Sequence, residues 1–93
     1  MDEKYIEKRL VMEVKKLGGL ALKLSPIGFD GMPDRLILLP NSRIAFIEVK
    51  AEGENPRPLQ LKRHRTLRKL GFKVYVLDNK DQIGGILSEI QTT

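Results

Sequence analysis

The stretch GMPDRLILLPNSRIAFIEVK (residues 31–50) is predicted to form two apolar strands joined by the short turn PNS (40–42). The first strand begins at Asp34, and the second ends with Glu48 and Lys50. Three charged side chains therefore stand at the open end of an otherwise apolar hairpin. Their position needs a physical explanation.

Side chains alternate along a strand, so the even-numbered residues of both strands (34–39 and 43–50) share one face. A three-residue turn (40–42) fixes which residues face each other: the last residue before the turn faces the first residue after it, and each step away from the turn gives the next pair. A register shifted by one residue would exchange the faces, which the apolar pattern disfavours. The predicted facing pairs are Leu39–Arg43, Leu38–Ile44, Leu36–Phe46 and Asp34–Glu48.

Two carboxylates that face each other across strands are destabilising, because their Cβ atoms lie roughly 4.5–5.5 Å apart. A hard divalent cation such as Mg²⁺ removes this cost, since it binds one or two carboxylates together with water and phosphate oxygens. Lys50 follows Glu48 on the same face and can reach the same pocket. The alternative is a polar rim in which Lys50 and Glu48 form a surface salt bridge worth ~0–1 kcal/mol. Three charges on one face favour a site.

A third carboxylate lies on the first predicted helix, DEKYIEKRLVMEVKKLGG (2–19), with Asp2 as N-cap and the glycine pair as its stop. Glu7 falls inside the apolar stripe of this helix, and a carboxylate facing the core is costly unless it is paired or binds a metal. We therefore expect Glu7 to contribute to the metal site. A side chain that reaches solvent at the sheet edge, or a pairing with Arg or Lys, stays open. Glu3 shares the arc, but the helix dipole explains an acidic residue at a helix start. The apolar stripe consists of Ile6, Leu10, Val14 and Leu17, widened by Val11.

The remaining segments complete an α/β pattern. LALKLS (20–25) and FKVYVL (72–77) alternate as strands do, the first with its leucines on one buried face. LQLKRHRTLRKL (59–70) is predicted to be a helix that Pro58 opens and Gly71 closes, with Leu59, Leu67 and Leu70 facing inward. DNKDQIGGILSEIQ (78–91) has helical spacing that its glycine pair weakens. The order α-β-β-β-α-β-α predicts one mixed four-stranded sheet flanked by helices.

Composition limits the class of protein. The 93 residues suffice for a single domain, and 41% hydrophobic and 31% charged residues are a globular balance. The absence of cysteine excludes disulfides, thiolate zinc sites and cysteine nucleophiles. No apolar run approaches the ~18 residues that span a bilayer, and the charged first residues are unlike a signal peptide. These features predict a cytoplasmic protein with no membrane contact.

The charge balance suggests a polyanionic partner. Lys and Arg total 17 against 12 acidic residues, for a net charge of +5. Such an excess favours phosphate contacts and counterion release, although a solvated surface accounts for the charge alone equally well.

Together these residues resemble the VRR-NUC domains, a branch of the PD-(D/E)xK nuclease superfamily. The resemblance rests on Gly31, Pro33-Asp34, the triplet Glu48-Val49-Lys50 and Gln60, and it covers nearly the whole chain (1–93) as one nuclease domain. Glu7 agrees with an acidic position on the first helix of that family. The order of elements agrees with the restriction-endonuclease-like αβββαβ core, here followed by a short C-terminal helix.

The resemblance implies a metal-dependent DNA endonuclease. Asp34 and Glu48 would bind Mg²⁺ or Mn²⁺ together with the Val49 backbone carbonyl. Lys50 would orient or help to deprotonate the attacking water, and Gln60 would support the site. Minimal members of the family resemble junction-resolving enzymes, which implies branched or duplex DNA as substrate and a homodimer. The alternatives are a nucleic-acid-binding module of the same fold without cleavage, and an unrelated metal-binding or structural domain.

The helix 59–70 carries the charge expected of a DNA-binding surface. Beside a phosphate-cleaving site its basic residues are predicted to hold the duplex backbone, although a solvated face is the ordinary meaning of such residues. His64 is the only histidine and is given no catalytic role, because a lone imidazole is more often structural. Gln60 is either a supporting residue or a helix-end amide bonded to backbone. The predicted DNA contacts are Lys62, Arg63, Arg65, Arg68 and Lys69.

Overall fold

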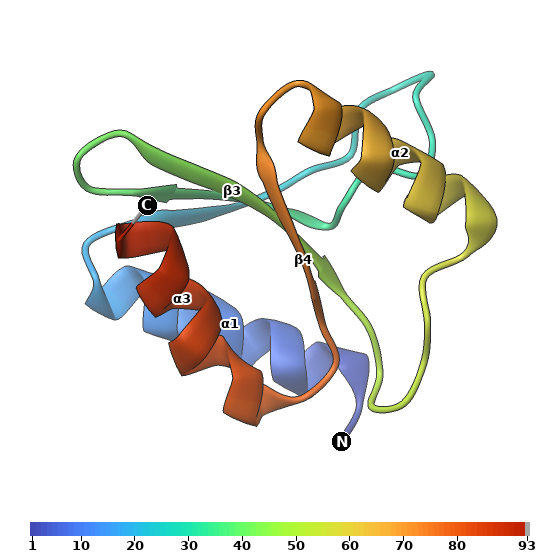
Figure 1. Ribbon diagram of the computed structural model, residues 1–93. Coiled ribbons are helices and arrows are strands. Elements are labelled where there is room, and N and C mark those ends of the chain that lie inside the picture. Colours follow the sequence, from blue (N-terminus) through green and yellow to red (C-terminus); the bar gives the residue numbers. More distant parts are fainter. Residues whose placement is uncertain (93) are drawn as a thin grey trace.

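The structure, a computed structural model, describes residues 1–92 and has its elements in the predicted order (Figure 1). The helices are α1 (Glu3–Lys16), α2 (Pro58–Lys69) and α3 (Ile83–Thr92), with a short 3-10 turn η1 (Lys80–Gln82) before α3; the strands are β1 (Leu20–Lys23), β2 (Arg35–Leu39), β3 (Arg43–Val49) and β4 (Lys73–Leu77).

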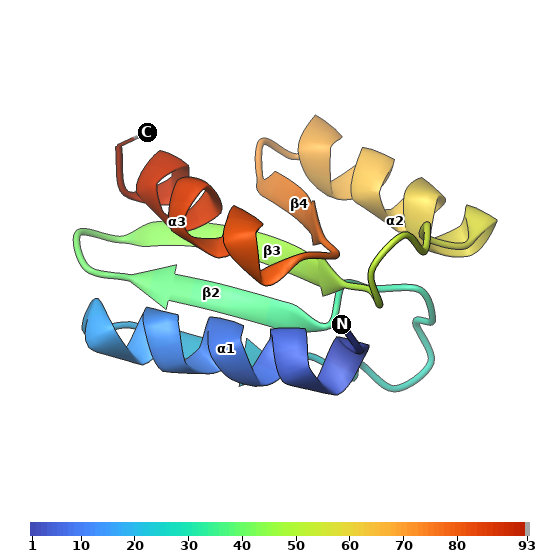
Figure 2. The same cartoon turned by 90° about the horizontal axis from the view of Figure 1, so that it is seen from below.

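The four strands form one mixed sheet in the order β1-β2-β3-β4. β1 and β2 are antiparallel, as are β2 and β3, whereas β4 runs parallel to β3 after the crossover through α2. Figure 2 shows the arrowheads of β3 and β4 pointing to one end of the sheet and that of β2 to the other. The predicted fold class is therefore confirmed.

The register of the β2–β3 hairpin is also the predicted one. Leu38 faces Ile44 and Leu36 faces Phe46. The turn brings Asn41 to φ 67° and Ser42 to φ 60°, a left-handed conformation that asparagine tolerates better than most residues. Asp34 lies one residue before β2, where its backbone carbonyl accepts a hydrogen bond from Leu24 N–H at 2.9 Å.

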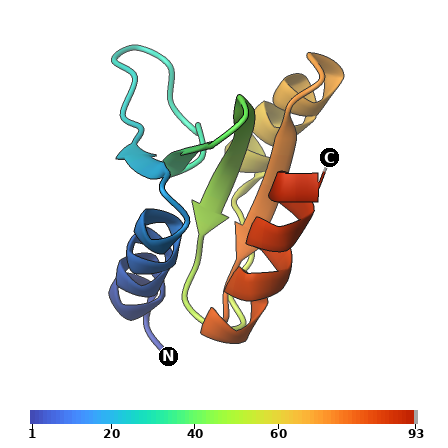
Figure 3. The same cartoon turned by 90° about the vertical axis from the view of Figure 1, so that its left-hand side faces the viewer.

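The hydrophobic core lies between one face of the sheet and the helices α1 and α3. The odd-numbered strand residues Ile37, Ala45 and Ile47 are fully buried there. They contact the buried stripes of the two helices, which lie together on the same side of the sheet in Figures 1 and 3. These stripes consist of Ile6, Leu10 and Val14 on α1 and Ile83, Leu87 and Ile90 on α3.

The opposite face of the sheet is covered in part. α2 lies on it and packs mainly against β4, which leaves the even-numbered apolar side chains of the other strands exposed or partly exposed, whereas Glu48 at the end of β3 is buried. The prediction that the leucines of residues 20–25 face the core is wrong: Leu20 is 57% and Leu22 43% exposed, while Ala21 packs against the core. The alternation identified the strand, but the small alanine faces α1.

The helix ends follow the sequence signals. The Asp2 side chain accepts a hydrogen bond from Tyr5 N–H at 2.8 Å, and Pro58 opens α2. On α2 the prediction of three inward leucines is wrong for two of them: Leu67 is buried, but Leu59 is 42% and Leu70 67% exposed. Polar side chains occupy the inward positions instead. No helix within residues 1–92 has the length and apolar character to cross a bilayer.

Candidate active site

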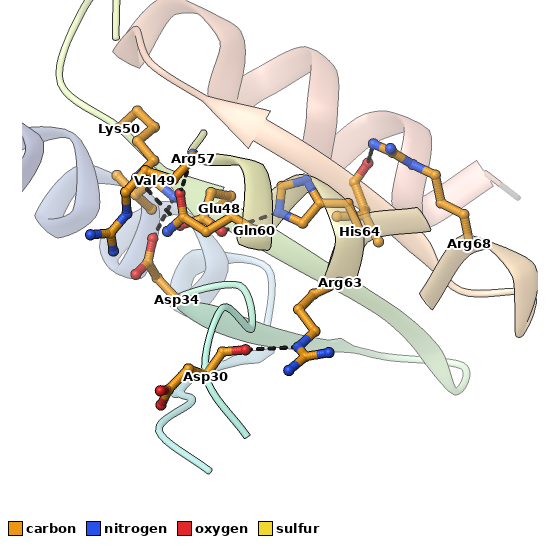
Figure 4. A network of polar contacts seen from close by, with 11 residues as sticks. Asp30, Asp34, Glu48, Val49, Lys50, Arg57, Gln60, Arg63, His64 and Arg68 are labelled. Atoms are coloured by element: carbon orange, nitrogen blue, oxygen red, sulfur yellow. Dashed lines mark hydrogen bonds and ion pairs between the residues drawn. The ribbon is translucent and has the colours of Figure 1, made fainter. Parts of the chain in front are cut away.

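Four of the predicted site residues lie where β2 begins, β3 ends and α2 begins. Asp34 lies just before β2, Glu48 and Lys50 lie at the end of β3, and Gln60 lies in the first turn of α2 (Figure 4). The hairpin register brings Asp34 and Glu48 to the same side, and the parallel crossover returns α2 over the end of β3.

Glu48 is the centre of this arrangement and is fully buried. Its Oε2 accepts a hydrogen bond from Gln60 Nε2 at 3.2 Å and lies 4.0 Å from Lys50 Nζ. Its Oε1 lies 3.1 Å from His64 Nε2. Side chains of α2 therefore contact both carboxyl oxygens of Glu48, and the Lys50 ammonium lies beside one of these oxygens.

Asp34 completes the carboxyl pair. Its Oδ2 accepts a hydrogen bond from Val49 N–H at 2.7 Å. Burial, a side-chain hydrogen bond with Asp34 and the charge of Asp34 together raise the pKa of Glu48 to about 8, against the opposing effect of Lys50. Without a cation, the two carboxyl groups can stay together when Glu48 keeps its proton.

Gln60 makes a contact that fits each of the two alternatives that the sequence left open. Its Oε1 accepts a hydrogen bond from Arg57 N–H at 2.8 Å, which caps the start of α2. Its Nε2 points the other way and donates to Glu48. The amide thus fixes the helix start to the buried carboxyl group (Figure 4).

On α1, Glu7 takes a cationic partner. Its Oε2 accepts a hydrogen bond from Arg35 Nε at 2.7 Å, and the same guanidinium donates to the Ala21 carbonyl at 3.0 Å. This pairing is one of the alternatives that the sequence left open for Glu7. Glu3 lies exposed in the first turn of the same helix, as expected of an acidic residue at a helix start. Desolvation and then the charge of Asp34 raise its pKa, and Lys50 lowers it.

The donors at the site suit a hard cation. Within residues 1–92 no group of three or more His, Cys, Asp or Glu side chains could hold a metal by itself. The carboxyl groups of Asp34 and Glu48 are a pair with which Mg²⁺ keeps its water and phosphate ligands. The residues present therefore fit Mg²⁺ or Mn²⁺ better than a metal that needs a full cage of side chains.

The basic residues of α2 differ in their contacts. Lys62, Arg65, Arg68 and Lys69 are exposed, whereas Arg63 is partly buried. Arg63 donates to the Asp30 carbonyl at 2.7 Å and stacks on Phe29, with 3.8 Å from its guanidinium carbon to the ring centroid. Arg68 donates to the Val74 carbonyl at 2.8 Å, so two of the five predicted DNA contacts also hold the fold together.

Comparisons with known proteins agree with this geometry. The chain is 53% identical over 79 residues to "Putative nuclease p44" of Acyrthosiphon pisum secondary endosymbiont phage 1, covering 85% of each protein. A solved structure described as "VRR_NUC domain" matches with a TM-score of 0.87 and 37% sequence identity, over 92% of this chain and 94% of that one. No protein-family profile matches the sequence.

Proposed function

Because the chain belongs to the VRR-NUC family of nucleases, we propose that it is a metal-dependent endonuclease that hydrolyses phosphodiester bonds in DNA. The observation that carries this proposal is the pairing of Asp34 and Glu48 beside Lys50. A carboxyl pair of which Glu48 is fully buried is costly for a small fold even with an adjacent ammonium, and a cation-binding site gives it a purpose.

Asp34, Glu48 and the Val49 carbonyl are the proposed holders of Mg²⁺ or Mn²⁺. When bound, such an ion stabilises negative charge on the phosphate and lowers the pKa of a coordinated water.

We assign Glu7 a smaller contribution, since Arg35 already holds its carboxylate at 2.7 Å. Glu7→Gln is expected to weaken Mn²⁺ binding measured by calorimetry. An unchanged affinity would mean that Glu7 pairs with Arg35 and does not contribute to the metal site.

Lys50 is the proposed residue that handles the nucleophile. In hydrolysis the water oxygen bonds to phosphorus, the bond from phosphorus to the leaving sugar oxygen breaks, and one proton moves from the water to that oxygen. An amine near the water can orient it and relay the proton, and an ammonium stabilises the charge that develops on the phosphate. The Lys50 side chain is 12% exposed and lies beside Glu48, which holds it at the site.

Branched DNA and a homodimer extend the proposal. A chain of 93 residues offers limited surface for gripping DNA, and two symmetric copies would address two strands at once. The half-exposed apolar face of the sheet supports the dimer, because a second copy would cover side chains that α2 leaves open. The exposed cations of α2 support contact with the phosphate backbone.

A DNA-binding module without catalysis is the second candidate. The basic α2 would serve it equally well, but it would have no use for the buried carboxyl group and the ammonium beside it. A fold without catalysis would also gain stability by replacing buried Glu48 with an apolar residue.

Cleavage of supercoiled plasmid, linear duplex and four-way-junction DNA, each with Mg²⁺, Mn²⁺ or EDTA, tests the proposal. We expect cleavage with either metal, none in EDTA, and a preference for the junction. Asp34→Asn is the matched inactive control. Equal cleavage in EDTA would refute the metal mechanism, and DNA binding without cleavage of any substrate would favour the second candidate.

A further inference from the structure

The only histidine of the chain lies where it can act on the proposed metal site. His64 follows Gln60 by one helical turn on α2, and its side chain is fully buried. Its Nε2 lies 3.1 Å from Glu48 Oε1, on the oxygen that Gln60 does not contact (Figure 4). The sequence interpretation gave this residue no catalytic role.

The i, i+4 spacing places Gln60 and His64 on one face of α2, directly over the end of β3. One helix thereby holds the two oxygens of one carboxyl group through two side chains of different chemistry. A carboxylate oxygen has two lone pairs, so each hydrogen bond leaves room for a further ligand on the same oxygen.

The environment of the other ring nitrogen, Nδ1, indicates that the imidazole makes its polar contact through Nε2. Nδ1 is buried and makes no hydrogen bond with any residue in the range 1–92. An unpaired buried polar atom costs free energy, so a histidine at this position needs a compensating function. The contact from Nε2 to Glu48 is the one that the ring makes.

We propose that His64 is a positioning residue for the metal site: its Nε2–H fixes the orientation of the Glu48 carboxylate so that the remaining lone pairs face the cation. This inference rests on the proposed metal-dependent function. Hydrogen-bond partners that orient metal ligands change metal affinity by roughly 10–100-fold when they are removed. His64 touches neither DNA nor water in this role and acts through Glu48.

Calorimetric titration of Mn²⁺ into His64→Leu and His64→Gln separates this role from a structural one. Glutamine carries its amide nitrogen at the same position along the side chain as imidazole Nε2, so it can keep the donor. We expect His64→Leu to weaken Mn²⁺ binding roughly 10–100-fold and His64→Gln to restore most of the loss. If the leucine variant fails to fold, His64→Asn replaces it, because its shorter amide cannot reach Oε1.

Thermal denaturation in EDTA provides the control for folding. A purely structural histidine would lower the melting temperature of both variants and leave Mn²⁺ affinity within about twofold of the wild type, which would overturn the inference. Equal losses of affinity in the leucine and glutamine variants would also overturn it. Failure of the wild type to bind Mn²⁺ would refute the proposed function itself, whereas wild-type binding with an unaffected His64→Leu would refute this inference alone.

Discussion

Glu48 links the chemistry of the proposed site to the stability of the fold. Its pKa lies near 8 in the folded chain, above the 4.5 of an ordinary glutamate, because of burial and Asp34. Between these two pH values the folded chain keeps a proton that the unfolded chain releases. The contribution of Glu48 to the free energy of unfolding of the metal-free protein should therefore fall as pH rises from about 4.5 to about 8, by an amount on the order of a few kcal/mol. His64 acts in the opposite direction, because burial lowers the pKa of its imidazole and its contribution therefore rises with pH.

Urea denaturation in EDTA at pH 5, 6, 7 and 8 measures this slope. Glu48→Gln is the control, because a neutral amide at the same position cannot titrate and should flatten the curve. A wild-type stability that falls with pH no more steeply than that of Glu48→Gln would contradict the raised pKa. Mg²⁺ should oppose the loss at pH 8, since a cation favours the ionised carboxylate.

Lys50 can be separated from metal binding by a single substitution. Its Nζ lies 4.0 Å from Glu48 Oε2, and it is not among the proposed metal ligands. Lys50→Ala should reduce the single-turnover cleavage rate at least ~100-fold, the usual contribution of a group that handles a proton, while Mn²⁺ affinity stays within a few-fold. Near-normal turnover in this variant would remove Lys50 from the mechanism.

At the residue scale, the sequence predicted the carboxyl pair because strand alternation and turn length are local properties. Asp34, Glu48 and Lys50 needed one hairpin register to come together. The partner of Glu7 could not be found in this way, since Arg35 lies 28 residues away and meets α1 only after the sheet has packed. His64 was missed for the same reason, because it lies 16 positions after Glu48 in the sequence.

At the element scale, Gly31 connects the loop before β2 to α2. It has φ +87°, and a Cβ built at this position would lie 2.8 Å from Leu59 Cγ and 3.2 Å from Arg63 Cγ. Gly31→Ala should therefore cost the left-handed strain of about 1–2 kcal/mol and, in addition, a packing clash of about 1–3 kcal/mol. The displaced loop would also move Asp34 and slow cleavage.

Gly28 is the matched control for this prediction. It has φ +77° in the same loop, but a Cβ there would meet nothing within 4 Å. Gly28→Ala should show the strain alone and leave cleavage nearly unchanged. Equal urea midpoints and equal cleavage rates for the two variants would contradict a specific contact between Gly31 and α2.

The exposed cations of α2 form the surface by which we expect this helix to hold DNA. Each phosphate contact contributes about 0.9 to the slope of log affinity against log salt on duplex DNA. Replacing three cations should lower that slope by about 2 to 3, measured by fluorescence anisotropy in EDTA. The test variant combines Lys62→Ala, Arg65→Ala and Lys69→Ala.

A charge-matched control lies on α1. Its triple variant loses the same three charges from another helix and should keep the wild-type salt slope. Equal losses in both triple variants would mean that net charge, and not α2, determines binding. The control combines Lys8→Ala, Lys15→Ala and Lys16→Ala.

At this scale the sequence predicted whether each element is a helix or a strand better than it predicted which of its side chains are buried and what they contact. Period-two alternation identifies a strand whichever face is covered, so the buried face of β1 was assigned wrongly. The basic helix was recognised from composition, but the use of Arg63 and Arg68 as backbone donors depends on a loop and a strand that the helix meets only in the fold.

At the scale of the whole molecule, the face of the sheet that α2 covers only in part exposes apolar side chains. Leu20, Leu22 and Ile44 are 57%, 43% and 42% exposed on one continuous face, and contiguous apolar surface of this kind usually marks a protein interface. Such a patch carries no charge, so two copies can meet through it without electrostatic repulsion at its centre. A second copy of the chain is the occupant that the proposed cleavage of two strands requires.

Sedimentation equilibrium over about a hundredfold range of concentration tests this assembly. We expect a dimer for the wild type and a monomer for Leu22→Glu, because a buried carboxylate without a partner opposes association. Leu70→Glu is the control: Leu70 is 67% exposed at the C-terminal cap of α2 and is not one of the exposed strand residues of the patch, so its variant should stay dimeric. A wild-type monomer that cleaves both strands of a junction would refute the dimer, and a Leu22→Glu dimer would place the interface on another surface.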